Sequence, residues 1–480
     1  MRFIGKDPNI TDAYYTATAS GAITAGNTCI VNSDGTVSVV SGASGGTGSA
    51  TAFKAASGII DIASTFDTTN DKLVVVYSEN SPLDSYAKVG TISGTSISFG
   101  SEVDWYTGSN RATTMGATFD SNSGKVVVTY LDVGNSNYGT AIVGTVSGTS
   151  ISFGTPVVFR SASVLDTDGP CFDSDTNQVV IPYRLASSND GHCILGTVSG
   201  TSISFGADAE FDTNYATTPC SAYDTANSKV VIAFSDSNNY PSLIVGTVSG
   251  TSISFGTKLI AQSGAASGNN NVSFDSTTGK ILLQIRDGTN SNYGTAFVGT
   301  VSGTSISVGT KVVYNSGDTQ QPSAAHNPVD GKNYLMYRDA GNGNKAVYVV
   351  GTISGTSVSF TSEVELTAST ASNMSKSTNS NGSAKILFNF DASNEGQTIV
   401  LEAANTNVTT ENYIGVADQS YADGDDATLA IVGCIDRNQT GLTAGQQYFI
   451  QKDGTIGTTA DDPSVLAGTA ISATELVVKE

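Results

Sequence analysis

The chain has 480 residues, enough for several domains, and a formal net charge of −21. Charged side chains make up only 14% of it, and 52 residues are glycine. This composition disfavours a helix-rich protein. The negative charge would repel the phosphates of nucleic acids and of anionic membranes, so we expect no nucleic-acid partner. Hydrophobic residues, many of them β-branched or aromatic, reach 39% and exclude a disordered chain.

The first residues, MRFIGKDPNITDAYY, lack the apolar stretch of a secretory signal, and nowhere do 18 apolar residues run together. We therefore expect no membrane insertion and no export by the usual route. The cysteines form no CxxC pair, so we expect buried free thiols in place of disulfides or a zinc site. They are Cys29, Cys171, Cys193, Cys220 and Cys434.

An eleven-residue phrase, typically GTVSGTSISFG, occurs six times at steps of 50–54 residues. A period near 50 residues is typical of the four-stranded blades of a β-propeller and too long for leucine-rich or ankyrin repeats. The phrase therefore predicts an all-β propeller. Its copies begin at Gly90, Gly144, Gly196, Gly246, Gly299 and Gly351.

Each repeat is predicted to contain four strands, A to D. In the second repeat these are MGATFD, KVVVTYLD, AIVGTVS and TSISFGTPVVF. The A–B turn begins with an aspartate, as at Asp67, Asp120, Asp224 and Asp275, and ends before a lysine. Asp bonds its own backbone ahead, so these segments are predicted to be hairpin turns. A calcium loop would need more alternating carboxylates than most copies carry.

Seven A–B hairpins can be counted, but only six C–D hairpins, because no copy of the phrase follows TIVLEA in the seventh repeat. Residues 49–57, SATAFKAAS, precede the first A strand and match the place of a D strand. We expect a propeller of seven blades over residues 49–405, closed by this N-terminal strand. Six or eight blades stay open as alternatives.

The two ends of the chain resemble each other. Residues 23–37, ITAGNTCIVNSDGTV, align without a gap with residues 442–456, LTAGQQYFIQKDGTI. Both predict a hairpin with an Asp-Gly turn. We expect residues 1–48 and 406–480 to form one discontinuous β module, with residues 41–51 as a flexible linker. The glycines of this linker are not followed by GK[ST], so a phosphate loop is not predicted.

Little in the sequence supports catalysis, and we predict no catalytic residue, no cofactor and no metal site. The two histidines, His192 and His326, cannot supply a histidine-based triad or a histidine-rich metal site. Arg111, Arg184, Arg286 and Arg338 come from different repeats and suggest a sialidase, but the SxDxGxTW box of that family is absent. A carboxylate pair of the glycosidase type, such as Asp132 with Asp287, stays an alternative. The acidic segment 423–426 is predicted to be an exposed turn and not a calcium site.

In a four-stranded meander the B–C and D–A connections emerge on one face. These connections are longer and more varied than the other turns, and binding residues concentrate on such loops. Asp and Asn exchange hydrogen bonds with hydroxyls, and Tyr offers a flat apolar face, so this face is predicted to bind sugar. The candidate ligand-binding residues are Tyr86, Asp132, Asn135, Asn137, Tyr138, Asp236, Asn239, Tyr240, Asp287, Asn290, Asn292, Tyr293, Asp339 and Asn342.

The C-terminal residues include the segments IGVA, LAIVG, GLTAGQQYF and AGTAIS. In these segments the chain resembles small β modules of tailed-bacteriophage virion proteins, including tail fibres and head decoration proteins. The central repeats are similar to propellers of phage structural proteins. The resemblance implies a virion protein made in host cytoplasm.

We expect the terminal module to dock to other virion proteins and the propeller to contact host-surface glycan or protein as a tail-associated adhesin. A head decoration or head-fibre protein, and a polysaccharide-degrading enzyme, are the alternatives. No heptad repeat predicts a coiled-coil stalk, so any homo-oligomer would form through the β module or through neighbouring virion proteins.

Overall fold

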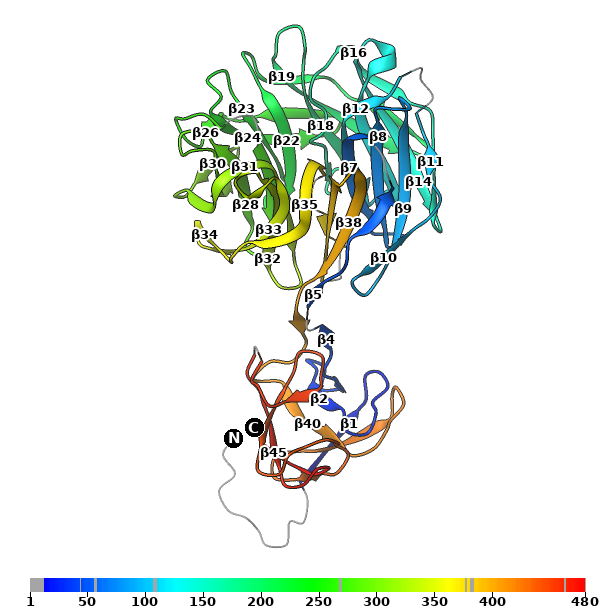
Figure 1. Cartoon of the computed structure of the whole chain (residues 1–480), viewed down its shortest axis with the longest axis vertical. Coiled ribbons are helices and arrows are strands. Elements are labelled where there is room, and N and C mark those ends of the chain that lie inside the picture. Colours follow the sequence, from blue (N-terminus) through cyan, green and yellow to red (C-terminus); the bar gives the residue numbers. More distant parts are fainter. Residues whose placement is uncertain are drawn as a thin grey trace. The chain divides into compact units, whose positions relative to one another are not determined.

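The computed structural model describes residues 13–43, 45–55, 58–106, 110–266, 270–375, 378–379, 384–461 and 463–479. These residues form β-strands joined by turns, with two short 3-10 helices, which confirms the predicted all-β class (Figure 1). None of the described helices is long and apolar enough to cross a membrane. The chain divides into two compact units. Unit 1 comprises residues 1–46 and 403–480, and unit 2 comprises residues 47–402.

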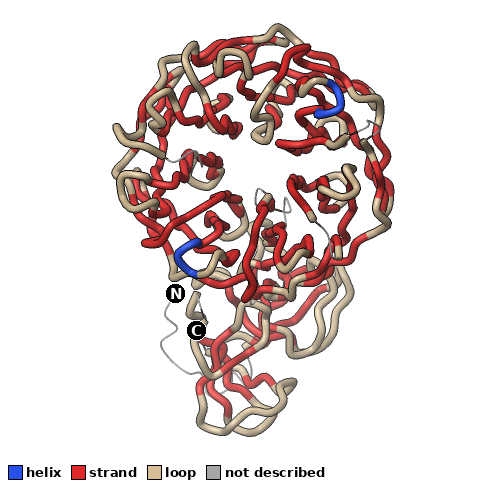
Figure 2. Tube along the Cα trace, turned by 45° about the horizontal axis from the view of Figure 1, so that its top comes forward, coloured by secondary structure: helices blue, strands red, loops and turns tan. Residues whose placement is uncertain are grey.

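Among the described residues, unit 2 consists of four five-stranded antiparallel sheets and one fourteen-stranded sheet, arranged around a common centre (Figure 2). The first two repeats contain β7 (Ile59–Asp67), β8 (Lys72–Glu79), β9 (Ser85–Ser93), β10 (Ser96–Phe99) and β11 (Val103–Asp104), then β12 (Ala112–Asp120), β13 (Lys125–Asp132), η1 (Val133–Asn135), β14 (Tyr138–Ser147), β15 (Ser150–Phe153) and β16 (Val157–Ser163). The next two contain β17 (Cys171–Asp173), β18 (Gln178–Arg184), β19 (Gly191–Ser199), β20 (Ser202–Phe205) and β21 (Ala209–Asp212), then β22 (Thr217–Asp224), β23 (Lys229–Ser235), β24 (Pro241–Ser249), β25 (Ser252–Phe255) and β26 (Leu259–Ile260).

The last three repeats share one continuous sheet. Two long strands, β31 (Val312–Asn327) and β35 (Val364–Met374), each run from the outer edge of one repeat into the inner strand of the next. The other elements are β27 (Asn270–Asp275), β28 (Lys280–Asp287), β29 (Tyr293–Ser302), β30 (Ser305–Val308), β32 (Lys332–Asp339), η2 (Ala340–Asn342), β33 (Lys345–Ser354), β34 (Ser357–Phe360), β36 (Thr378–Asn379), β37 (Lys385–Ala392), β38 (Glu395–Glu402), β5 (Gly46–Thr47) and β6 (Thr51–Lys54).

The predicted D strand is two strands in the structure. In the second repeat β15 pairs with the C-terminal half of β14, and β16 pairs with the N-terminal half of the same strand. The break falls at Gly154, whose N–H bonds the carbonyl of Val143. The A–B turns are hairpin turns as predicted, because the aspartate that opens each turn accepts backbone hydrogen bonds two and three residues ahead, as Asp120 does from Asn122 and Ser123.

Several positions of the eleven-residue phrase have a structural role. Its central glycine, such as Gly148, adopts φ +60° and closes the C–D turn. The following isoleucine is buried, as Ile151 is. The last glycine lies against the next repeat. A Cβ on Gly100 would stand 1.9 Å from the carbonyl oxygen of Thr149, so any larger residue would push the two repeats apart.

Aromatic side chains join neighbouring repeats. Phe159, on the outer strand β16, packs on Tyr183 of the next repeat with ring centroids 5.4 Å apart. The glycine opposite Phe159, Gly139, leaves room for its ring. The same arrangement joins Phe211 to Phe234 and Tyr314 to Tyr337. The apolar cores of unit 2 therefore lie mainly between repeats, where residues of two adjacent sheets interdigitate.

Residues of β6 contact both the last and the first repeat. β6 pairs with β38, which follows the predicted seventh A–B hairpin. Phe53 of β6 lies opposite Gly396 of β38 and packs on Tyr77 of the first repeat, with centroids 5.3 Å apart. One core cluster contains Phe53, Leu387 and several residues of β7 and β8. Residues 51–54 thus occupy a D-strand position in the last repeat, as their sequence predicts.

Unit 1 contains two five-stranded sheets and a two-stranded ladder of β4 (Gly42–Ala43) with β39 (Asn405–Thr406). The first sheet has the order β1-β41-β40-β2-β3, with β1 (Tyr14–Thr18), β2 (Thr28–Val31), β3 (Val37–Val39), β40 (Tyr413–Ala417) and β41 (Asp426–Ala430). The second has the order β42-β46-β45-β43-β44, with β42 (Ile435–Asp436), β43 (Gln447–Ile450), β44 (Ile456–Gly457), β45 (Leu466–Ala470) and β46 (Leu476–Val478).

The two sheets of unit 1 are copies of one strand pattern. In β2–β40, Cys29 pairs with Gly415 and the next residue skips one partner, and in β43–β45 Tyr448 pairs with Gly468 and the next residue skips one partner. The predicted hairpins β2–β3 and β43–β44 are present in both. In chain order β1, β2, β3, β40 and β41 match β42 to β46. Unit 2 is therefore inserted between the third and fourth strands of the first copy.

We predict that Phe53→Ala destabilises unit 2. The ring fills the space beside Gly396 and against Tyr77, and deletion of a buried phenyl group typically costs about 3–5 kcal/mol. Thermal unfolding followed by calorimetry measures the effect. The control is Ala52→Ser in the same strand, where the side chain is exposed. Equal unfolding temperatures for both variants would show that β6 contributes nothing to unit 2.

Candidate functional site: the loop face and the inner-strand cavity

The B–C loops of unit 2 contact the D–A connections through backbone hydrogen bonds. In each of several repeats the loop ends on an asparagine with positive φ, such as Asn137 at +60° and Asn239 at +59°. The carbonyl of this asparagine accepts a hydrogen bond from a residue at or before the next inner strand, 3.0 Å to Val164 N and 2.8 Å to Ala266 N. Asn tolerates the left-handed conformation, so its recurrence has a backbone reason. We name this surface the loop face.

The predicted aspartates shape the loops. Asp236 and Asp287 are buried, and their carboxylates accept from backbone N–H groups two residues ahead, at 2.9 and 3.1 Å. Asp287 also binds Lys311 Nζ at 2.8 Å. Asp339 accepts from Gly341 N at 2.8 Å, and Asp132 accepts from Tyr106 at 2.5 Å. Because their carboxylates bond to other groups of the protein, these side chains fix the conformation of the loops.

The remaining predicted residues are either exposed or half-buried. Asn135, Asn137 and Asn239 are exposed. The other members are half-buried, and each lies in the loop or first strand residues of its own repeat. They are Tyr86, Tyr138, Tyr240, Asn290, Asn292, Tyr293 and Asn342. The sequence-predicted residues therefore line separate loops, and the structure does not gather them into one pocket.

A cavity of about 230 Å³ lies among the inner strands, and sequence reasoning missed it. Its lining comes from the A-strand segment of every repeat, near the strand starts and hence toward the loop face. The lining is largely polar. Contributing residues include Asp61, Met115, Asp168, Thr218, Asn270, Asn271, Gln321 and Asn373. The sequence signal was present at Asn270 and Asn271, because consecutive asparagines are unusual inside a strand.

Several oxygens of this cavity are acceptors without a donor. The side-chain oxygens of Asn270, Asn271, Thr218 and Gln321 are buried and have no hydrogen-bond partner among the described residues. Thr218 and Gln321 also have φ of +47° and +49°, beside bulges in β22 and β31. Non-glycine residues in this conformation cost free energy and cluster at functional sites. The cavity thus lies beside polar groups whose hydrogen-bonding capacity is unused.

Two aspartates that line this cavity, Asp61 and Asp168, have different environments. Burial raises the pKa of Asp61 to about 7, although Met115 N donates to its carboxylate at 2.9 Å, and the negative charge of Asp168 adds to the rise. Asp168 is exposed. At neutral pH the cavity therefore holds one carboxyl group near its titration midpoint beside a second carboxyl group that water reaches.

Each of the four arginines considered above is held by hydrogen-bond partners, and Asp318 lies near both Arg286 and Arg338. Arg184 Nε donates to Asp166 at 2.8 Å, and Arg286 makes a two-bond contact with Asp318 at 2.7 and 3.0 Å. Arg338 contacts Gln320 and the carbonyl of Ala371, and Arg111 donates to Asn80.

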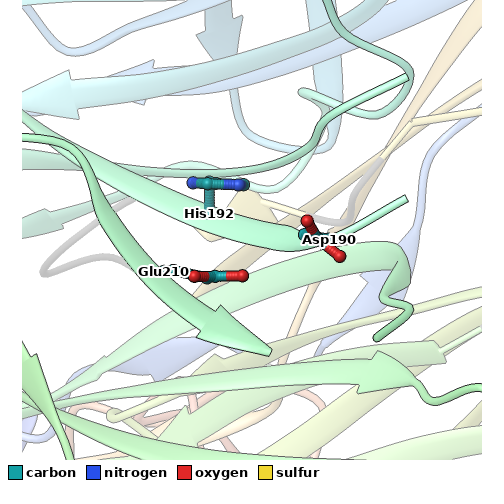
Figure 3. A group of neighbouring side chains, drawn as sticks. All are labelled: Asp190, His192 and Glu210. Atoms are coloured by element: carbon teal, nitrogen blue, oxygen red, sulfur yellow. The ribbon is translucent and has the colours of Figure 1, made fainter. Parts of the chain in front are cut away.

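A second polar group lies in the third repeat. Asp190, His192 and Glu210 place their ligand atoms within 4.8 Å of one another (Figure 3). His192 also bonds Asp208 through Nδ1 at 2.9 Å. The other histidine, His326, is buried beside Asp275 with Nδ1 3.6 Å from the carboxylate. Burial lowers the pKa of His326.

No family model and no curated protein matches the sequence. Among solved structures, the BP39L lectin from Burkholderia pseudomallei has a TM-score of 0.57 at 9% identity and covers 74% of this chain and 99% of its own. AofleA from Arthrobotrys oligospora has a TM-score of 0.42 at 10% identity, covering 66% and 88%. A sialidase from Trypanosoma rangeli has 0.43 at 9% identity, covering 81% and 59%. The chain therefore has a fold similar to that of the lectin, with repeated antiparallel sheets as in β-propellers.

We predict that Asp61 makes stability fall as pH rises from about 4 to about 7. The folded protein keeps a proton that the unfolded chain releases above its ordinary pKa of about 4, so proton release favours unfolding across this window. In Asp61→Asn this component is absent, and the Tm of the variant relative to the wild type should rise across the window and level off above it. The control is Asp71→Asn at an exposed turn. A Tm difference that stays constant with pH would contradict the raised pKa.

Proposed function

We propose that this protein is a non-catalytic structural component of a tailed-phage virion, in which unit 2 binds host-surface glycan and unit 1 docks to other virion proteins. The observation that carries the glycan proposal is the inner-strand cavity, whose lining of amide, hydroxyl and carboxyl side chains is largely polar. Sugar hydroxyls exchange hydrogen bonds with such side chains, and the cavity has room for one sugar residue. The fold similarity to a protein named as a lectin agrees with this proposal.

We propose further that unit 2 is a closed propeller of seven blades. Seven A–B strand pairs occur among the described residues. The contact between Phe53 and Tyr77 has the same form as the aromatic contacts between successive repeats. Ser64 of β7 also lies 2.8 Å from Ser375 Oγ, and Asn389 of β37 donates to Ser64 at 3.0 Å. Closure would leave no exposed sheet edge in the ring.

The virion role rests on the sequence resemblance of the terminal and central segments to phage structural proteins. We place the protein at the tail, as an adhesin, because a ring of differing loops on a uniform scaffold suits recognition. A head decoration or head-fibre protein is the alternative location. In either location the protein would be made in host cytoplasm and released on lysis.

Immunogold electron microscopy of purified particles tests the virion role. We expect label at the tail or baseplate, because host recognition requires that location. Label over the head would replace the adhesin role with the decoration or head-fibre role. Particles without label, prepared in parallel with an antibody to a known capsid protein as positive control, would contradict the virion proposal.

We predict that Asn271→Ala weakens binding of unit 2 to host-surface glycan at least tenfold, because it removes a buried acceptor of the cavity. Replacing Tyr138, Tyr240 and Tyr293 together with Ala tests the loop tyrosines in the same way. Binding to purified host polysaccharide by surface plasmon resonance measures both. The control is Asn122→Ala in an exposed A–B turn on the opposite face. Unchanged binding in both variants would contradict the choice of this face.

Hydrolysis of a glycan is a second candidate function, favoured by one observation. Asp61 is near its titration midpoint at neutral pH and shares the cavity with Asp168, and glycosidases use one protonated and one ionised carboxyl group. Release of reducing sugar from host polysaccharide by the wild type, and its loss in Asp61→Asn, would favour the enzyme over the binding protein.

A further inference from the structure

The group of Asp190, His192 and Glu210 follows from the strand register of the third repeat. His192 of β19 and Glu210 of β21 are direct cross-strand partners, so their side chains lie on the same face of the sheet. Asp190 stands two residues before His192, and residues two apart share a face along an extended chain. Figure 3 shows the three side chains gathered between these two segments.

The imidazole ring of His192 is oriented by its surroundings. Its Nδ1 bonds Asp208 Oδ2 at 2.9 Å, and the ring stacks on Tyr183 with centroids 5.5 Å apart and an interplanar angle of 18°. Asp208 is itself fixed by Tyr183 Oη at 2.6 Å and by Arg160 at 3.0 Å. A carboxylate on Nδ1 is the arrangement that commonly presents Nε2 to a metal ion.

The equivalent positions of other repeats show that the third repeat is distinct. In the sixth repeat Lys345 and Glu365 take the places of Asp190 and Glu210 and form an ion pair at 2.7 Å. In the fifth repeat these places hold Tyr293 and Val313. In the first repeat Asp84 and Asp104 take these places, around Tyr86. Among the described residues the third repeat is therefore distinct in setting two carboxylates around a histidine, without the lysine of the sixth repeat. Such a group is stabilised by a bound cation.

We propose that Asp190, His192 and Glu210 bind a divalent metal ion of the zinc class. One imidazole nitrogen and two carboxylates are a donor set that zinc accepts, with water at the remaining position. Calcium prefers six to eight oxygen ligands, and this group offers too few. Glu210 is exposed, so solvent reaches the ion. The site requires neither glycan binding nor a virion role.

Isothermal titration calorimetry of the full chain, stripped with chelator and titrated with Zn²⁺ alone, tests the site. We expect one zinc ion per chain. His192→Gln and Glu210→Gln should each weaken the affinity at least tenfold, because each removes a ligand. The matched control is Glu365→Gln, which alters the same position of the sixth repeat and should leave zinc affinity unchanged.

Cobalt substitution identifies the ligands. Co²⁺ bound at this site should give visible d–d bands without the near-ultraviolet charge-transfer band of a thiolate ligand, because the half-buried Cys171 and the other cysteines are not part of the group. If His192→Gln does not fold, Asp190→Asn at the strand end provides the same test. The absence of zinc binding by the wild type, equal affinity in the ligand variants, or a thiolate band would each overturn the proposal.

Discussion

The close contact between the last glycine of one repeated phrase and the threonine carbonyl of the next sets the spacing of unit 2. A Cβ on Gly154 would lie 1.9 Å from Thr201 O, and the same distance holds at Gly206, Gly309 and Gly48. No side chain larger than hydrogen fits, so the phrase tolerates little change. The sixth copy ends in Thr361, which is consistent with this reason, because no phrase follows in the next repeat to approach it.

The same constraint links the start of unit 2 to its end. Gly48 contacts Thr95 of the first repeat while its N–H bonds Val400 of the last, at 2.9 Å. Phe53 then packs on Tyr77 as the outer aromatic residues pack between other repeats. A short segment before the first inner strand therefore repeats the contacts that the full phrase makes elsewhere. Because this short segment makes the contacts of a phrase, six copies of the phrase accompany seven A–B pairs.

Unit 1 illustrates how repetition and insertion combine. Its two sheets share strand order, pairing register and bulge position, and a Cβ on Gly415 or Gly468 would meet a carbonyl of the neighbouring strand at 2.2 or 2.3 Å. The second copy is continuous in sequence, whereas the first is interrupted after β3 by the whole of unit 2. The duplicated strand pattern accepts the insertion because its two halves still pair through β2 and β40.

The sequence by itself determined the strands, the turns and the repeat, because alternation, Asp-led hairpins and packing glycines act over short distances. It also predicted a D strand within residues 49–57, where β6 pairs with β38 in the structure. The sequence did not determine which residues form the candidate sites. Asp236, Asn239 and Asp287 resembled sugar ligands, but the structure uses Asp236 and Asp287, and the backbone of Asn239, to shape loops. Only the tertiary structure brought Asp61 together with Asn271, and Asp190 with Glu210, because inner-strand convergence and cross-strand register join residues far apart in sequence.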